Sequence, residues 1–412
     1  MSSPSESGAL RTLLTVAFRP FFLAAALWGA IAVGLWIAML TIGLRLPSRL
    51  DPLDWHIHAM LFGFAPAAVA GFLLTAIANW TGRPPVSGVR LGLLAGLWLL
   101  GRLDELLSAL WPAWLAIAAD LAFPLALAAV VAHELIVTRN RRNYPMIVPI
   151  LVISIAQWLM DLGVQGGDGA LTGYGWRLGL VALLILISVV GGRIVPSFTH
   201  NWLLGRSSDR LPPPVGGLDR ASPVVLHTAL VGWVFFPAAR PIGMALLVGA
   251  ALTLWRLLRW RGAATRSEPL LLILHVGYLW LALGVAALAA ANLDSAFALG
   301  AAIHALTVGA IGTMILAVMT RVSRGHTGRT LAADGPSVLI YALVVLAAAA
   351  RIAAAFAIAA RQSLLVSAAA LWVGAFGLFL VRYAPVLLRP RGSAERTASP
   401  AAPAVSIASS RH

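Results

Sequence analysis

The chain has 412 residues, of which 60% are hydrophobic and only 11% are charged. A water-soluble globular protein is about 45–50% apolar and about 25% charged, so this composition excludes a soluble enzyme. The formal net charge of +15 comes from 30 basic residues, all of them Arg, against 15 acidic residues. Cys is absent, which excludes disulfides and thiolate-bound metals and leaves His, Met, carboxylates and water as metal ligands.

Apolar stretches along the chain are long enough to cross a bilayer, for which about 20 residues per helix are needed. In chain order they cover about 18–42, 56–79, 89–110, 113–137, 146–163, 176–194, 223–239, 241–259, 269–291, 296–320, 336–360 and 363–387. The seventh and eighth stretches can also be one long broken helix, so eleven to thirteen spans are defensible. The sequence therefore predicts an all-α polytopic membrane bundle of about twelve transmembrane helices.

The predicted bundle forms a single integral-membrane domain over residues 1–388. The first apolar stretch is too long for a signal-peptide core and no small-residue cleavage site follows it, so no cleavable signal is expected. Residues 389–412 are rich in Ser, Ala, Pro and Arg, which predicts a disordered cytoplasmic tail. No repeat relates the two halves of the chain, which disfavours a carrier built from inverted halves.

The distribution of Arg predicts the orientation of the bundle. Of the 30 Arg, 22 lie at the two termini and in the loops that follow the even-numbered spans, six lie on the opposite face, and two lie within spans. Because loops rich in Arg stay in the cytoplasm, we expect both termini to be cytoplasmic in a bacterial inner membrane. The basic excess is then a topology signal, and no nucleic-acid partner is expected; the expected surroundings are membrane lipid.

Histidines at membrane depth are the main candidates for chemistry, because ionisable groups there are costly and are usually functional. His56 and His58 open the second span on the outer side, and His304 lies roughly 12 Å into the tenth span from the same side. If these two spans are neighbours, the three residues meet at similar depth. Neutral imidazole ligates haem iron or copper without adding charge. We therefore predict a cofactor site at His56, His58 and His304.

Two residues apart on a regular helix, His56 and His58 point about 200° from each other. One ring can then face a cofactor while the other faces a different partner, or both converge where the helix end is irregular. Arg351, in the outer half of span eleven, has no acidic neighbour in sequence. Its predicted partner is an anionic cofactor group or a carboxylate such as Asp104, with snorkelling to the surface as the alternative.

A second, inner metal site is predicted nearer the cytoplasmic side. His227 and His275 lie a few residues into spans seven and nine from that side, and His200 ends span six in a stretch broken by Gly and Pro. Irregular backbone at membrane depth is tolerated where it lines a buried site. The alternative for each of these residues is an ordinary polar contact between helices. That ordinary contact is the preferred interpretation for His133 and His326, which lie at the cytoplasmic interface.

Several motifs together resemble the NnrS family of bacterial membrane proteins. They are Arg19-Pro20-Phe21-Phe22, the stretches 55–64 and 71–76, the stretch 191–202, His227, His275, and the segment from His304 to Arg321. The resemblance covers nearly the whole chain up to the tail. It implies a twelve-span, haem- and copper-containing inner-membrane protein linked to nitric oxide, nitrosative stress and denitrification, with nitric oxide as its small-molecule ligand and with no settled reaction.

The leading functional hypothesis is thus a haem–copper protein that handles nitric oxide, with a nitric-oxide oxidoreductase as one form of it. Two alternatives stay open: a twelve-span secondary transporter without a redox cofactor, and a non-catalytic haem or metal sensor or assembly factor. The loop at 81–85 lacks the Gly-x-x-x-Asp-Arg-x-Gly-Arg pattern of major-facilitator carriers. Embedded acids are also few, which disfavours proton coupling.

Overall fold

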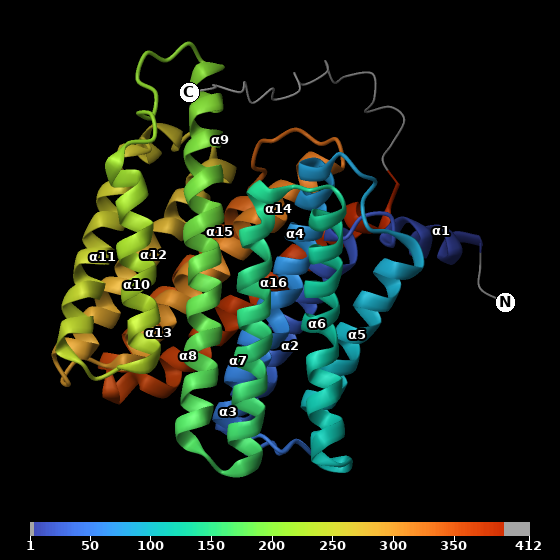
Figure 1. Cartoon of the computed structure of the whole chain (residues 1–412), viewed down its shortest axis with the longest axis vertical. Coiled ribbons are helices and arrows are strands. Elements are labelled where there is room, and N and C mark those ends of the chain that lie inside the picture. The colour runs from blue at the N-terminus through green and yellow to red at the C-terminus, as the bar shows by residue number, and fades with distance from the viewer. Residues whose placement is uncertain (1–3, 391–412) are drawn as a thin grey trace.

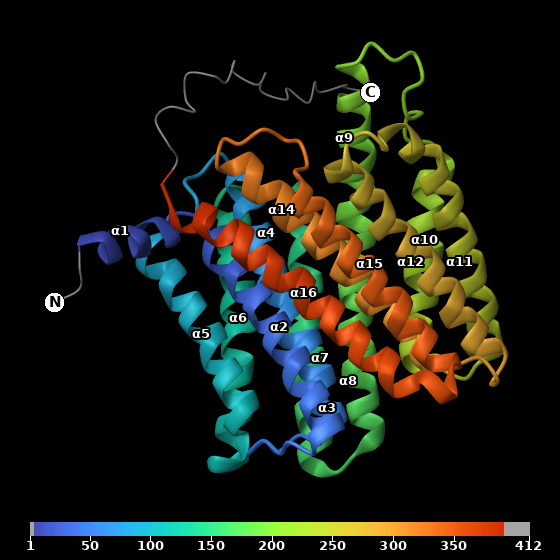
Figure 2. The same cartoon turned by 180° about the vertical axis from the view of Figure 1, so that it is seen from behind.

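The computed structural model describes residues 4–390, whose regular elements are all helical (Figure 1, Figure 2). The long helices and their parts are α1 (Pro4–Leu13), α2 (Phe18–Ile42), α3 (Pro52–His58), α4 (Ala65–Thr81), α5 (Gly88–Leu107), α6 (Ala113–Val137), α7 (Ile147–Gly166), α8 (Gly169–Leu186), α9 (Gly192–Leu204), α10 (Gly217–Phe235), α11 (Arg240–Arg259), α12 (Pro269–Leu293), α13 (Leu299–His304), α14 (Thr313–His326), α15 (Gly335–Phe356) and α16 (Arg361–Leu388). The predicted tail lies outside the described residues, apart from Arg389 and Pro390.

Three π-helical segments join pairs of these helices into single long passes. They are η1 (Ala59–Phe64) between α3 and α4, η4 (Ile187–Gly191) between α8 and α9, and η6 (Ala305–Gly312) between α13 and α14. Short 3₁₀ turns are η2 (Ser108–Leu110), η3 (Arg141–Met146), η5 (Gly262–Thr265) and η7 (Ile358–Ala360). Counted with these joints, the chain from α2 to α16 makes twelve helical passes.

The predicted all-α membrane bundle is confirmed. Ten of the passes are long and apolar enough to cross a membrane. The other two, α5 and α10, are of similar length but carry charged residues, among them Arg102, Glu105 and Asp219. The seventh and eighth predicted spans are separate helices, α10 and α11, because the chain breaks at 236–239 and the two helices pack against each other.

The twelve passes form three consecutive groups of four. The third passes of the groups begin at Gly88, Gly217 and Gly335, roughly 120 residues apart, and the second pass of each group contains the π-helical segment. The fourth pass of each group packs against the first pass of the next: α6 on α7, α11 on α12, and α16 back on α2. The groups therefore close into a ring with approximate threefold repetition.

Tryptophan side chains hold the π-helical segment η1 in place. A π turn disrupts the regular hydrogen-bond ladder of a helix and leaves carbonyl groups in need of partners. The indole of Trp28 donates to the carbonyl oxygen of Ala59 at 3.1 Å, and that of Trp98 donates to the carbonyl oxygen of Gly63 at 3.0 Å. The widened turn is thus satisfied from α2 and α5 on its two sides.

The two ends of the bundle differ in charge as the sequence predicts. The connections with many Arg, such as those between α6 and α7 and between α9 and α10, lie at one end, and the Arg-poor connections, such as that between α7 and α8, lie at the other (Figure 1). We call these the Arg-rich and Arg-poor ends. Both α3 and α13 lie toward the Arg-poor end.

Candidate functional site

A cavity of about 310 Å³ lies toward the Arg-poor end. Its walls come from α2, α3, η1, α13, η6, α15 and α16, together with Ala65 of α4 and with Trp176 and Leu180 of α8. It therefore lies where the third group of passes meets the first, beside α8 of the second group. Most of the lining is aliphatic or aromatic, including Trp36 and Trp372. The ionisable side chains of the lining are His56, His304 and Arg351. Three of the four residues predicted for the cofactor site therefore share one apolar cavity.

The geometry of His304 leaves a ring nitrogen free for a ligand. Its Nδ1 lies 2.7 Å from the carbonyl oxygen of Gly300. A carbonyl can only accept, so Nδ1 carries the hydrogen and the neutral ring keeps an unprotonated Nε2. This is the arrangement found for histidines that ligate metals, in which the second nitrogen is fixed by a backbone partner. The π turn of η6 begins at the next residue, Ala305.

His56 faces the same cavity and is held by an aromatic stack. Its ring stacks on Trp36 with centroids 4.7 Å apart and planes within 13°. The Nδ1 atom of His56 is buried and has no hydrogen-bond partner among residues 4–390. A buried polar atom without a partner is costly, so this nitrogen is available to a bound group.

Arg351 is a cation without a countercharge in the described part of the chain. It lies close enough to His56 and His304 to interact with both electrostatically, and no carboxylate of residues 4–390 lies within 4.0 Å of its guanidinium. Asp104, the carboxylate considered as its partner, instead accepts a hydrogen bond from the indole of Trp111 at 2.6 Å. The cavity therefore combines two imidazoles with one unpaired guanidinium.

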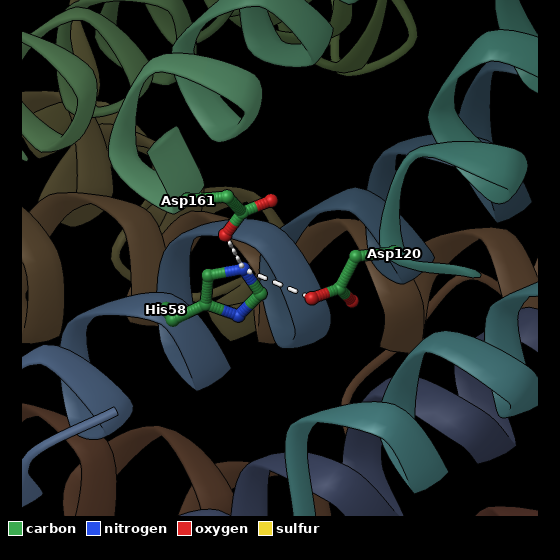
Figure 3. Close-up of side chains that lie close together, drawn as sticks. All are labelled: His58, Asp120 and Asp161. Carbon is green, nitrogen blue, oxygen red and sulfur yellow. Dashed lines mark ion pairs between the residues drawn. The ribbon is translucent and has the colours of Figure 1, made fainter. Parts of the chain in front are cut away.

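His58 lies outside this cavity and belongs to a second buried site (Figure 3). Its Nε2 is 3.4 Å from Oδ2 of Asp120 and 3.3 Å from Oδ1 of Asp161, and its Nδ1 is 3.3 Å from Oε1 of Glu105. Arg102 pairs with Glu105 and with Oδ1 of Asp120. We refer to these five residues, contributed by α3, α5, α6 and α7, as the His58 cluster. All five are buried.

The two sites occupy related positions in the threefold repeat. His58 and His304 each directly precede a π-helical segment in the second pass of their group. Arg102 and Arg351 each lie five residues before the end of the third pass. The same two positions of the repeat are therefore occupied by His58 and Arg102 at the carboxylate-rich cluster and by His304 and Arg351 at the apolar cavity.

The predicted inner histidines each contact a hydroxyl group. Nε2 of His227 lies 3.0 Å from the hydroxyl of Ser188, and Nε2 of His275 lies 2.8 Å from the hydroxyl of Thr199. His200 is half-buried on α9. Within residues 4–390, the group of three or more His, Asp or Glu side chains close enough to share a metal ion is His58, Asp120 and Asp161. The inner metal site therefore stays a prediction.

A comparison with known protein families matches residues 12–391 to the NnrS family, whose description is "NnrS protein". The match covers nearly the whole chain. The chain belongs to the NnrS family. A search of curated proteins finds no match.

For this member of the NnrS family, sequence reasoning missed the carboxylates of the His58 cluster. Glu105, Asp120 and Asp161 are not among the residues that the sequence predicts for a site. A signal was present, because each lies in a helical pass, where an ionisable side chain is a functional candidate. The family match and the buried His–carboxylate cluster together fit a metal-binding membrane protein.

Proposed function

We propose that the protein binds haem in the His304 cavity and handles nitric oxide in the bacterial inner membrane, which relieves nitrosative stress. The observation that carries this proposal is the convergence of His304, His56 and Arg351 on one apolar cavity. The family match and the buried His58 cluster fit a metal-binding membrane protein.

The residues present fit a haem. His304 offers an unprotonated Nε2, and His56 offers a buried nitrogen without a partner. Arg351 supplies the cation that a haem propionate needs, since a guanidinium binds a carboxylate with two parallel hydrogen bonds. The aromatic and aliphatic walls, among them Trp36 and Trp372, match the apolar faces of a porphyrin.

The haem iron would supply the centre that binds the gas. The chain provides the rest: apolar walls that exclude water, imidazole ligands held by Gly300 and Trp36, and a low-dielectric setting that influences the redox potential. Nitric oxide is small and apolar, and partitions into lipid without a channel. The position of the cavity within the bundle is therefore compatible with a membrane-dissolved ligand.

Copper belongs to the inner histidines in this proposal. His227 and His275 each use one nitrogen to contact a hydroxyl group, and Nδ1 of His275 is buried without a partner among residues 4–390. His200 follows Thr199 directly in sequence, and we assign it to the same proposed copper site. In this structure the three inner histidines are not among the described side chains that lie close enough together to share a metal ion. Copper content that is unchanged in the double variant His227→Ala/His275→Ala would contradict it.

The proposed haem site is tested by the absorption spectrum and haem content of the purified protein and its His variants. We expect a Soret band in the unaltered protein and its loss in His304→Ala, with a shifted or weakened band in His56→Ala. His133→Ala is the matched control, because His133 is exposed on α6 and lies outside both sites. A wild-type spectrum in His304→Ala would overturn the ligand assignment. A colourless, metal-free protein would favour a carrier.

A further inference from the structure

The side-chain spacing in the His58 cluster suits a metal ion as well as a set of ion pairs. Nε2 of His58 lies 3.3 and 3.4 Å from its two carboxylate oxygens, and it has no hydrogen-bond partner among residues 4–390. Zinc bonds to His nitrogen and carboxylate oxygen are about 2.0–2.2 Å long. Two ligands on a tetrahedron with such bonds lie about 3.3–3.4 Å apart. The observed separations therefore equal the edge of a zinc tetrahedron.

Two buried polar atoms of the cluster lack hydrogen-bond partners in the described part of the chain, and a bound cation would satisfy them. Besides Nε2 of His58, Oδ2 of Asp161 is buried without a hydrogen-bond partner in the described part of the chain. His58 is fully buried, and Asp161 is 94% buried. An unsatisfied buried polar atom costs about 1–3 kcal/mol, and more when it is charged.

The charge balance of the cluster also favours a divalent ion. Glu105, Asp120 and Asp161 bring three negative charges when ionised, and Arg102 brings one positive charge. Buried charges are strongly unfavourable unless they are compensated, and a protonated His58 compensates only one of the remaining two. A divalent cation that replaces the proton on Nε2 of His58 neutralises both.

Neighbouring side chains hold His58 and Asp120 in position. Oε1 of Glu105 lies 3.3 Å from Nδ1 of His58, which gives the carboxylate–histidine–metal sequence common at metal sites. Glu105 is in turn paired with Arg102, and the indole of Trp55 donates to the backbone oxygen of Glu105 at 3.1 Å. The side-chain amide of Gln157 donates to the backbone oxygen of Asp120 at 3.2 Å.

A fourth ligand position is available beside the cluster. A small cavity of about 20 Å³ has Asp104, Ser108, Asp120, Asp161 and Gln165 in its lining, together with Arg49. One water molecule needs roughly 10–15 Å³ of such space. The cavity therefore accommodates one water on the open side of Asp120 and Asp161.

We propose that His58, Asp120 and Asp161 bind one divalent first-row metal ion, with zinc as the ion that the geometry fits best and water as its fourth ligand. One imidazole nitrogen and two carboxylate oxygens suit zinc, and the absence of sulfur ligands disfavours cuprous copper. Manganese and magnesium prefer more oxygen ligands in octahedral geometry. The site lies apart from the His304 cavity, so it does not depend on the haem proposal.

The proposal is tested by metal analysis of protein purified from cells supplied with zinc, manganese, iron and copper, followed by zinc titration of chelator-treated protein. We expect one equivalent of divalent metal in the unaltered protein. Asp161→Asn, which preserves volume, should reduce zinc affinity by more than about tenfold, and Glu105→Gln, behind the ligands, by about 10–100-fold. Asp168→Asn is the control, since Asp168 caps α8 at the same end and lies outside the cluster.

Two further measurements distinguish loss of zinc binding from misfolding and from loss of haem. His304→Ala should keep its zinc while it loses haem. Asp161→Asn should keep the far-UV circular dichroism and the gel-filtration profile of the unaltered protein, which report on its fold. Bound manganese or iron that is lost in Asp161→Asn would support the site and overturn the choice of zinc. Failure of the unaltered protein to bind any divalent ion, or full zinc binding by Asp161→Asn, would overturn the proposal.

Discussion

At the scale of single residues, His56 and His58 belong to two different sites toward the Arg-poor end of the bundle. They are two positions apart on α3, and a regular helix turns their side chains about 200° from each other. His56 stacks on Trp36 in an apolar cavity, whereas His58 lies among three carboxylates. The sequence allowed the two rings either to face different partners or to converge on one site. The structure shows them facing different partners, because the irregular π turn begins only after His58.

Arg351 provides a residue-scale prediction. Arg351→Gln removes the cation of the His304 cavity while it keeps a long polar side chain. A charge-assisted hydrogen bond contributes about 1.5–3 kcal/mol, so we expect haem retention to weaken by about 10–100-fold. Haem transfer to an excess of an acceptor such as apomyoglobin measures this loss. Arg240→Gln is the control, since Arg240 is exposed at the same end of the bundle; equal haem retention in both variants would contradict the role of Arg351.

At the scale of elements, the three π-helical segments determine where the functional side chains point. The close packing around η6 shows why its sequence is rich in small residues. A Cβ atom on Gly312 would lie 2.5 Å from the ring of Trp372, which also lines the cavity. The Trp372 indole itself donates to the carbonyl oxygen of Gly29 at 2.9 Å. The glycine therefore permits the approach of α16 to η6 and helps to shape the cavity wall.

Gly312→Ala is expected to destabilise the protein by about 1–3 kcal/mol, because overpacking forces the Trp372 ring out of position. Haem content should fall as well, since Trp372 lines the cavity. Thermal unfolding in detergent and the Soret absorbance measure the two effects. Gly377→Ala on α16 is the control, because its added Cβ would meet no atom within 4 Å. Equal unfolding temperatures for the two variants would contradict this packing argument.

The N-terminus of α15 provides a prediction on pH. Asp334 caps this helix through the backbone N–H of Ser337 at 3.1 Å and pairs with Arg324 and Arg382. Partial burial acts in the opposite direction, but the hydrogen bonds from Ser337 and Arg382 lower the pKa of Asp334 below its ordinary value of 3.8. Since the folded-state pKa is the lower one, the stabilisation is present above pH 3.8 and is lost as the pH falls through the folded value.

Asp334→Asn should therefore lower the unfolding temperature at pH 7, and the difference from the unaltered protein should shrink as the pH falls below 4. Loss of a helix cap costs about 0.5–2 kcal/mol. Asp168→Asn, at a cap without an ion pair, should show a smaller and less pH-dependent loss. A difference for Asp334→Asn that stays constant down to pH 2.5 would contradict the ion-pair explanation.

Much of the element level could be predicted from sequence. Apolar length located the passes because a bilayer imposes one length on all of them. The sequence left one or two spans open at the seventh and eighth stretches, and the break at 236–239 in the structure shows two. The π-helical joints could not be predicted, because they depend on tertiary partners such as Trp28 and Trp98. The estimated depth of each His in the membrane could place His56 and His304 together. It could not exclude His58 from their cavity, because the direction of that side chain also depends on tertiary packing.

At the scale of the whole molecule, the ring of three four-helix groups explains why no repeat relates the two halves. The chain repeats in thirds, and α16 packs on α2 to close the ring. The Asp and Glu of the His58 cluster come from α5, α6 and α7, the three passes that follow the pass of His58. Packing among these consecutive passes brings Asp120 and Asp161 to His58, so the cluster could not be derived from spacing along the sequence.

The orientation of the ring is testable because the chain has no Cys. Single substitutions Asp209→Cys and Ser295→Cys place a thiol on exposed connections at the Arg-rich and Arg-poor ends. If the Arg-rich end is cytoplasmic, a membrane-impermeant thiol reagent should label Ser295→Cys in intact spheroplasts and Asp209→Cys only after permeabilisation. The reverse pattern of labelling would invert the proposed topology.

The most direct measurement is the absorption spectrum of purified protein, compared among the unaltered chain, His304→Ala and His133→Ala and combined with metal analysis. The proposed function predicts a Soret band in the unaltered chain and in His133→Ala, and its loss in His304→Ala. A spectrum without haem in the unaltered chain purified from haem-sufficient cells, or an unchanged Soret band in His304→Ala, would contradict a haem bound at the cavity of His304, His56 and Arg351.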